Sequence, residues 1–106
     1  MKVVEIKFDF LMTCLYVYED GKLLGEYCDF YENKKINSIS GSLETLYNTC
    51  ITMDEHFKTT TINKEKIALN KSRFLHLLNE LNRLLEENSD GKYIVKDLET
   101  PKIKMM

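Results

Sequence analysis

A period of two in side-chain polarity near the start of the chain constrains the fold more than any other feature. Every even position from 4 to 18 is apolar: Val4, Ile6, Phe8, Phe10, Met12, Cys14, Tyr16 and Tyr18. Because successive side chains of a strand point to opposite faces of a sheet, the pattern predicts one long strand over 4–18, with its even positions in the core. Strands are seldom this long, so we expect a bulge or bend near residues 10–12.

Asp20-Gly21 follows this strand and predicts a two-residue turn of type I′, because both residues must accept a positive φ. Residues 22–32 then form the second arm of a long N-terminal hairpin. The turn sets the register of the two arms: Glu19 with Lys22, Tyr18 with Leu23, Val17 with Leu24, Tyr16 with Gly25, Cys14 with Tyr27, and Phe10 with Tyr31. The odd side of the first arm also becomes apolar, which predicts an additional surface covered by a helix or by another chain.

The middle of the chain is less regular. Residues 33–42 have the composition of a loop. Residues 43–57 carry apolar side chains at helical spacing and follow Ser42, a suitable N-cap, so they are predicted to form a helix. The alternation over 47–53 also fits a strand. Residues 59–69 are predicted to contain at most one or two short strands, around 60–62 and 66–69.

The clearest helical pattern runs from Lys71 to Asn88, with Asn70 or Ser72 as its cap. Its apolar stripe consists of Phe74, Leu77, Leu78, Leu81, Leu84 and Leu85. The turn residues 89–91 end this helix, and residues 92–98 read as a strand that returns to the sheet.

The order of these elements predicts an α+β fold. Residues 1–100 form a single small domain, in which a mostly antiparallel sheet led by the long N-terminal hairpin packs against one long and one shorter helix. Residues 101–106 form a flexible C-terminal tail. A chain of 106 residues supports one modest core.

Composition limits the classes of partner and the cellular locations that we expect for this protein. The formal net charge of -2 gives no reason to expect nucleic acid or an acidic membrane as partner, and no apolar run has the length of a membrane span. Three cysteines (Cys14, Cys28, Cys50) without a close pair fit neither a zinc site nor a disulfide framework, so we expect a reduced, cytoplasmic location. The excess of Lys over Arg indicates AT-rich codons, which are common in low-GC bacteria and their phages.

Charge is unevenly distributed along the chain. The hairpin is acidic through Glu19, Asp20, Glu26, Asp29 and Glu32. The middle segment is basic through Lys58, Lys64, Lys66, Lys71 and Arg73. The domain is therefore predicted to have an acidic and a basic region.

Candidate catalytic groups are few. The spacing of Asp20, Glu32 and Lys34 resembles the metal-binding pattern of restriction-type nucleases, which would imply a metal-dependent nuclease; it departs from that pattern because Asp20 belongs to a turn and Lys34 to a loop. The set 54–56 (Asp-Glu-His) has metal-binding side chains but lacks a further ligand at helical spacing, and His76 lies beside an apolar stripe. The cysteines fall on apolar faces. We therefore expect a protein that is not an enzyme and that uses no metal or cofactor.

Acids and aromatic side chains alternate in the second arm of the hairpin, a composition typical of protein–protein interfaces. The predicted partner-binding residues are Glu26, Tyr27, Asp29, Phe30, Tyr31 and Glu32. We expect the partner to be another protein with a basic surface, and the chain to be a stoichiometric inhibitor of a host or defence protein, encoded by a phage or mobile element. Two alternatives are a nucleic-acid-binding module through the basic segment 58–73 and the nuclease above. The pattern leaves open whether the chain forms a homodimer.

Overall fold

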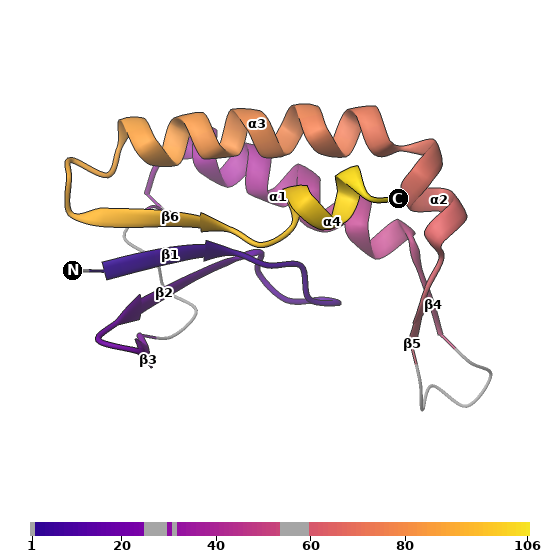
Figure 1. Ribbon diagram of the computed structural model, residues 1–106, viewed down its shortest axis with the longest axis horizontal. Coiled ribbons are helices and arrows are strands. Elements are labelled where there is room, and N and C mark those ends of the chain that lie inside the picture. Colours follow the sequence, from indigo (N-terminus) through magenta and orange to yellow (C-terminus); the bar gives the residue numbers. More distant parts are fainter. Residues whose placement is uncertain (1, 25–29, 31, 54–59) are drawn as a thin grey trace.

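The computed structural model describes residues 2–24, 30, 32–53 and 60–106 (Figure 1). In chain order the elements are β1 (Lys2–Ile6), β2 (Leu15–Glu19), β3 (Lys22–Leu23), α1 (Lys34–Thr49), β4 (Ile51–Met53), β5 (Thr60–Ile62), α2 (Lys64–Leu69), α3 (Lys71–Glu87), β6 (Tyr93–Asp97) and α4 (Thr100–Lys104). The main sheet has the order β3-β2-β1-β6, and β4 and β5 form a separate two-stranded sheet. Helices α1 and α3 pack together and contribute to one core with the sheet, which confirms the predicted α+β fold.

The long first strand of the prediction is wrong. Residues 4–18 are divided between two strands, β1 and β2, and the loop 7–14 that connects them. The two strands pair antiparallel. The register joins Val4 to Val17 and Ile6 to Leu15, so even positions of β1 share a face with odd positions of β2. All four side chains are buried in the core. The prediction that even positions face the core therefore holds for β1 and is inverted in β2.

Side chains from distant segments hold the loop that separates these strands. Three backbone N–H groups of the loop donate to them: Phe8 to Glu99 Oε1 (3.2 Å), Leu11 to Asn48 Oδ1 (3.2 Å) and Cys14 to Glu44 Oε1 (2.9 Å). Leu11 also has a φ of 60°, in the left-handed region that interrupts a strand. These acceptors replace the ladder partners that a continuous strand would have supplied.

The turn after β2 is as predicted. Asp20 and Gly21 have φ values of 51° and 79°, and Tyr18 lies opposite Leu23 in the paired strands. The N–H of Leu24 donates to the carbonyl of Val17 over 2.9 Å, which extends the register by one pair. Beyond this point the predicted second arm falls mostly outside the described residues, and its partner Phe10 lies in the loop 7–14 rather than in a strand.

Helix α1 begins far earlier than predicted, because residues 33–42 are not a loop. Asn33 is the N-cap, and its Oδ1 accepts hydrogen bonds from the N–H groups of Lys35 and Ile36 (3.1 Å each). Ile36 and Leu43 are fully buried on the core side of the helix. The helix ends at Thr49, and β4 follows over residues that the prediction assigned to the helix.

The second half of the chain follows the prediction more closely. Helix α3, β6 and the short strand β5 are confirmed, whereas residues 66–69 belong to helix α2 instead of a strand. Asn70 is the N-cap of α3 by position, although its side chain donates to the carbonyl of Lys66. Residues 101–106, predicted to be a flexible tail, include most of α4, and Ile103 of this helix is only 2% exposed.

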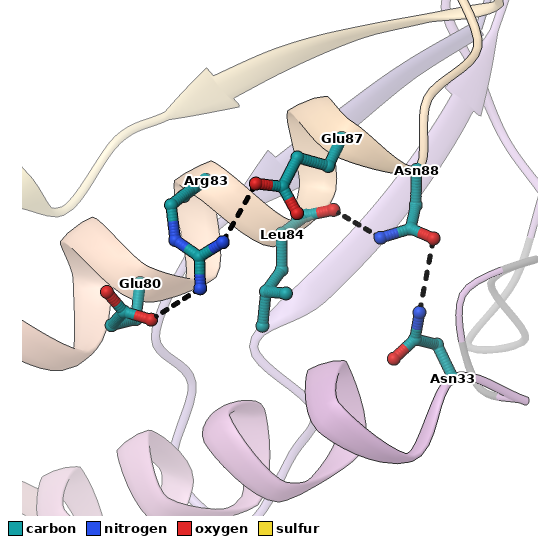
Figure 2. Close-up of polar contacts among 6 residues, drawn as sticks. All are labelled: Asn33, Glu80, Arg83, Leu84, Glu87 and Asn88. Carbon is teal, nitrogen blue, oxygen red and sulfur yellow. Dashed lines mark hydrogen bonds and ion pairs between the residues drawn. The ribbon is translucent and has the colours of Figure 1, made fainter.

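A hydrogen bond between side chains joins the start of α1 to the end of α3 (Figure 2). Asn88 donates to the carbonyl of Leu84 (2.8 Å), and its Oδ1 accepts from the amide of Asn33 (3.3 Å). One turn earlier, Arg83 bonds Glu80 and Glu87 at 2.8 Å each, and its bond to Glu80 lowers the pKa of that carboxyl. Exposed ion pairs such as these add little stability, so the core rather than this network holds the helices in place.

Candidate partner-binding face of the sheet

A row of four apolar side chains crosses the main sheet on the face opposite its buried residues. The strand register places them side by side in the order Leu23, Tyr18, Val3 and Ile94. Leu23 and Ile94, at the two edges, are 51% and 54% exposed, while their neighbours on the core side, such as Val4 and Val17, are buried. We call these four residues the apolar row. It brings together four strands from both ends of the chain.

An open hollow of about 490 Å³ lies along this row. Its lining combines apolar and charged side chains: Val3, Glu5, Tyr18, Asp20, Gly21, Ile94, Val95 and Lys96. Glu5 and Lys96 are cross-strand neighbours, and their charged groups are 3.9 Å apart. Glu19 and Asp20 are exposed at the turn next to the row. An apolar centre with charged groups at its rim is the arrangement found in protein–protein contacts.

The other end of this face carries a tyrosine with a fixed position. Tyr16 is paired with Glu5 on the same face, and its hydroxyl donates to Asp9 Oδ2 over 2.9 Å. Tyr16 is buried, whereas Tyr18, two residues along, is partly exposed. The loop 7–14 therefore bounds the face at this end, and the accessible apolar surface lies toward the turn.

The predicted partner-binding residues are only partly described. Glu26, Tyr27, Asp29 and Tyr31 lie outside the described residues. Phe30 is 4% exposed, and its ring centroid lies 4.9 Å from that of Tyr93, so Phe30 belongs to the core instead of an outward surface. Glu32 is exposed just before α1.

The structure also reverses the side on which the additional surface lies. The odd positions Leu15 and Val17, which were expected to form it, are buried against the core. The even position Tyr18 lies on the accessible face instead. The physical reason is the pairing of β2 with β1, which turns the odd side of β2 toward the helices.

The metal-binding candidates are placed as follows. Asp20 lies in the turn after β2, Glu32 precedes the cap of α1, and Lys34 is the first residue of that helix. Asp54, Glu55 and His56 lie outside the described residues. Within the part of the chain that the structure describes, no group of three or more His, Cys, Asp or Glu side chains could hold a metal ion.

Two lysines of the basic segment 58–73 bond to the carbonyl ends of helices. Lys66 Nζ donates to the carbonyl of Thr49 at the end of α1 (3.3 Å), and Lys71 Nζ donates to the carbonyl of Lys104 at the end of α4 (3.1 Å). Cations are favoured at helix C-termini, where carbonyl groups lack partners. These lysines therefore contribute to the packing of the helices. Lys58 lies outside the described residues.

Cys14 and Cys50 are buried, as the sequence predicts, and Cys28 lies outside the described residues. Burial, aided by the nearby Glu44 carboxylate, raises the pKa of the Cys14 thiol to about 12. A thiol with such a pKa is protonated at neutral pH and is a poor nucleophile.

Two members of the apolar row were missed from the sequence. The runs Val3-Val4 and Tyr93-Ile94-Val95 place apolar side chains on both faces of β1 and β6, and such runs are a signal of a two-sided strand. What the sequence lacks is the order of the strands, which places both residues beside Tyr18. Searches against protein-family models, curated proteins and solved structures found no match to this chain.

Proposed function

We propose that this protein is a non-enzymatic binding module that holds another protein on the accessible face of its sheet. The observation that carries the proposal is the apolar row, which spans the full width of the main sheet and remains exposed at both edges. A partner that covers the row would remove apolar surface from water, which is the main driving force for association. The tyrosine within the row supplies an aromatic side chain of the kind enriched in binding hot spots.

The charges beside the row define the partner's chemistry. Glu19 and Asp20 are exposed at the turn, and Asp20 lines the hollow. A partner with a basic patch would approach this end faster than a neutral one, because opposite charges steer diffusional encounter. The narrower proposal is a stoichiometric inhibitor that occupies a basic groove of a host or defence protein in a bacterial cytoplasm. Its support is compositional: small size and AT-rich codon usage.

The test compares two variants that make the same change at two exposed aliphatic residues. The immobilised protein is exposed to bacterial lysate, and captured proteins are identified by mass spectrometry for wild type, Ile94→Ser and Leu69→Ser. We expect one predominant basic protein to bind wild type and Leu69→Ser, and to be lost with Ile94→Ser. Raising the salt concentration should weaken the capture, because charge steering is screened.

Thermal melts serve as the folding control for both variants. Exposed substitutions change stability by about 0.5 kcal/mol or less, so a lost partner with an unchanged melt reports on binding alone. Capture that is equally strong with Ile94→Ser would contradict the proposal. Recovery of nucleic acid in place of a protein would contradict it as well and would favour the basic segment.

A further inference from the structure

A second exposed apolar surface lies at the opposite end of the molecule, where α2 and the C-terminal end of α4 lie side by side (Figure 1). Leu69 and Met105 are 85% and 88% exposed, among the largest values for apolar side chains in the described residues. Ala68, Met105 and Met106 line an open hollow of about 540 Å³. We call these three residues, together with the exposed Leu69 that follows Ala68 at the end of α2, the apolar tip.

Hydrogen bonds hold the C-terminal end of α4 beside the junction between α2 and α3. Lys71 Nζ donates to the carbonyls of Lys104 (3.1 Å) and Met106 (3.4 Å), which fixes the end of α4 beside the start of α3. Ile103 of the same helix is buried in the core. The tip is thus a supported surface rather than a loose end of the chain.

Lysines surround the apolar tip. Lys64 and Lys102 line the hollow together with Glu65, and Lys66 and Lys104 are exposed on the same two helices. Lys102 also pairs with the buried Glu99 at 3.5 Å. The local charge is therefore positive, although the chain as a whole carries a net charge of -2.

We propose that the apolar tip docks on an anionic lipid membrane surface. Lysines with aliphatic side chains between them fit this partner, because the cations meet lipid phosphates while Leu and Met reach the acyl boundary. Long lysine side chains can keep their charge at the headgroups while their stems contact apolar groups. Among the described residues, the lining of this hollow includes neither Arg nor an aromatic ring, and Lys is depleted in protein–protein interfaces, so a protein partner fits less well.

The position of the tip is compatible with this orientation. The molecule is elongated, with extents of 44 × 29 × 25 Å, and Figure 1 shows the acidic turn between β2 and β3 at the end away from α2. A membrane bound by the apolar tip would therefore lie far from Glu19 and Asp20, which it would repel. The apolar row would stay accessible, so this inference does not depend on the proposed function.

Co-sedimentation with lipid vesicles tests the inference. The probes are vesicles of phosphatidylcholine alone and of phosphatidylcholine mixed with an equal amount of phosphatidylglycerol, at low and high salt. We expect the full chain to sediment with the mixed vesicles at low salt, to be released by salt, and to remain in solution with the neutral vesicles. Lys64→Gln and Lys104→Gln should each weaken binding about five-fold, the contribution expected of one lysine near an anionic surface.

The apolar contribution is tested with the same pair of variants as the capture experiment. Leu69→Ser should weaken vesicle binding roughly ten-fold, because it removes methylene groups from the acyl boundary, while Ile94→Ser should bind as wild type does. The two variants thus have opposite effects in the two assays, so failure of one proposal is distinguishable from failure of the other. Thermal melts again confirm that each variant is folded.

Three results would overturn the inference. Absence of binding to the mixed vesicles at low salt would exclude a membrane and leave the tip to an acidic protein. Equal binding to neutral and anionic vesicles, or binding that Leu69→Ser leaves intact, would show that the lysines and the apolar tip do not act as described.

Discussion

The two faces of the main sheet carry similar apolar side chains, but these are buried on one face and partly exposed on the other. On one face Val4, Ile6, Leu15 and Val17 are buried beneath the helices. On the other, the apolar row consists of residues as hydrophobic, yet its outer members are more than half exposed. Hydrophobicity therefore does not tell which face of a strand is the core. The helices decide this, because α1 and α3 cover one face.

The difference also separates stability from binding. Side chains under the helices have already released their free energy of transfer from water when the chain folds. The apolar row has not, so the same kind of contact is still available to a partner. Substitutions on the two faces should therefore affect different measurements.

The largest effect is expected on the buried face. Ile6→Ala should lower the free energy of unfolding by about 2–5 kcal/mol, since it leaves a cavity in the core around a fully buried side chain. Urea denaturation measures this change, and the slope of the transition should stay constant. A loss well below this range would mean that the face is less closely packed than the structure shows.

The turn that sets the register of the apolar row comes next. Gly21→Ala should destabilise the fold by about 1–2 kcal/mol, because an L-residue is strained in the left-handed region; Gly21 has a φ of 79°. An added Cβ meets nothing within 4 Å, so the cost is one of backbone conformation alone. Gly41→Ala is the matched control: the site is equally roomy but helical, and the change should stabilise by about 0.5–1 kcal/mol. Equal effects at the two glycines would contradict the turn geometry.

A pH test sharpens the description of the buried layer. Because burial raises the pKa of Cys14 from 9.0 to about 12, the neutral thiol stabilises the folded state below pH 9, and this contribution is lost as the pH rises toward 12. Between about pH 8 and about pH 10 the free energy of unfolding should fall by about 1 kcal/mol more in wild type than in Cys14→Ala. All other titratable groups are the same in the two proteins, so the difference between their pH curves reports on Cys14. Parallel pH curves for the two proteins would show that Cys14 is accessible to water.

The smallest effect is expected on the accessible face. Ile94→Ala repeats the substitution made at Ile6, and it should cost less than about 1 kcal/mol, the span of intrinsic preference for a strand. Urea denaturation of the two variants side by side measures the contrast between the faces. If Ile94→Ala is as destabilising as Ile6→Ala, another part of the chain covers the row in solution.

Local patterns in the sequence predicted the elements that depend on neighbouring residues. The type I′ turn at Asp20-Gly21 follows from the two residues themselves, and α3 follows from an apolar stripe with helical spacing. The missed start of α1 was also local: Ile36, Ile39 and Leu43 have helical spacing, but the Asn- and Ser-rich composition outweighed this signal. Asn is a preferred N-cap residue, so Asn33 indicated a possible start of this helix.

What local patterns could not supply is which strands meet. The break between β1 and β2 depends on Glu44, Asn48 and Glu99, whose side chains come from segments more than 25 residues away and take over the hydrogen bonds of the loop. The same break inverts β2, which buries Val17 and exposes Tyr18.

The apolar row and the apolar tip arise in the same way. Val3 and Ile94 stand within short apolar runs of the sequence (Val3-Val4 and Tyr93-Ile94-Val95), and these runs do not tell which of their members face away from the core. Strand order then places these two residues in one row with Tyr18 and Leu23, and helix packing places Ala68 near Met105. A strand or helix carries its own periodicity, but a surface is shared between segments, so its composition exists only after those segments pack.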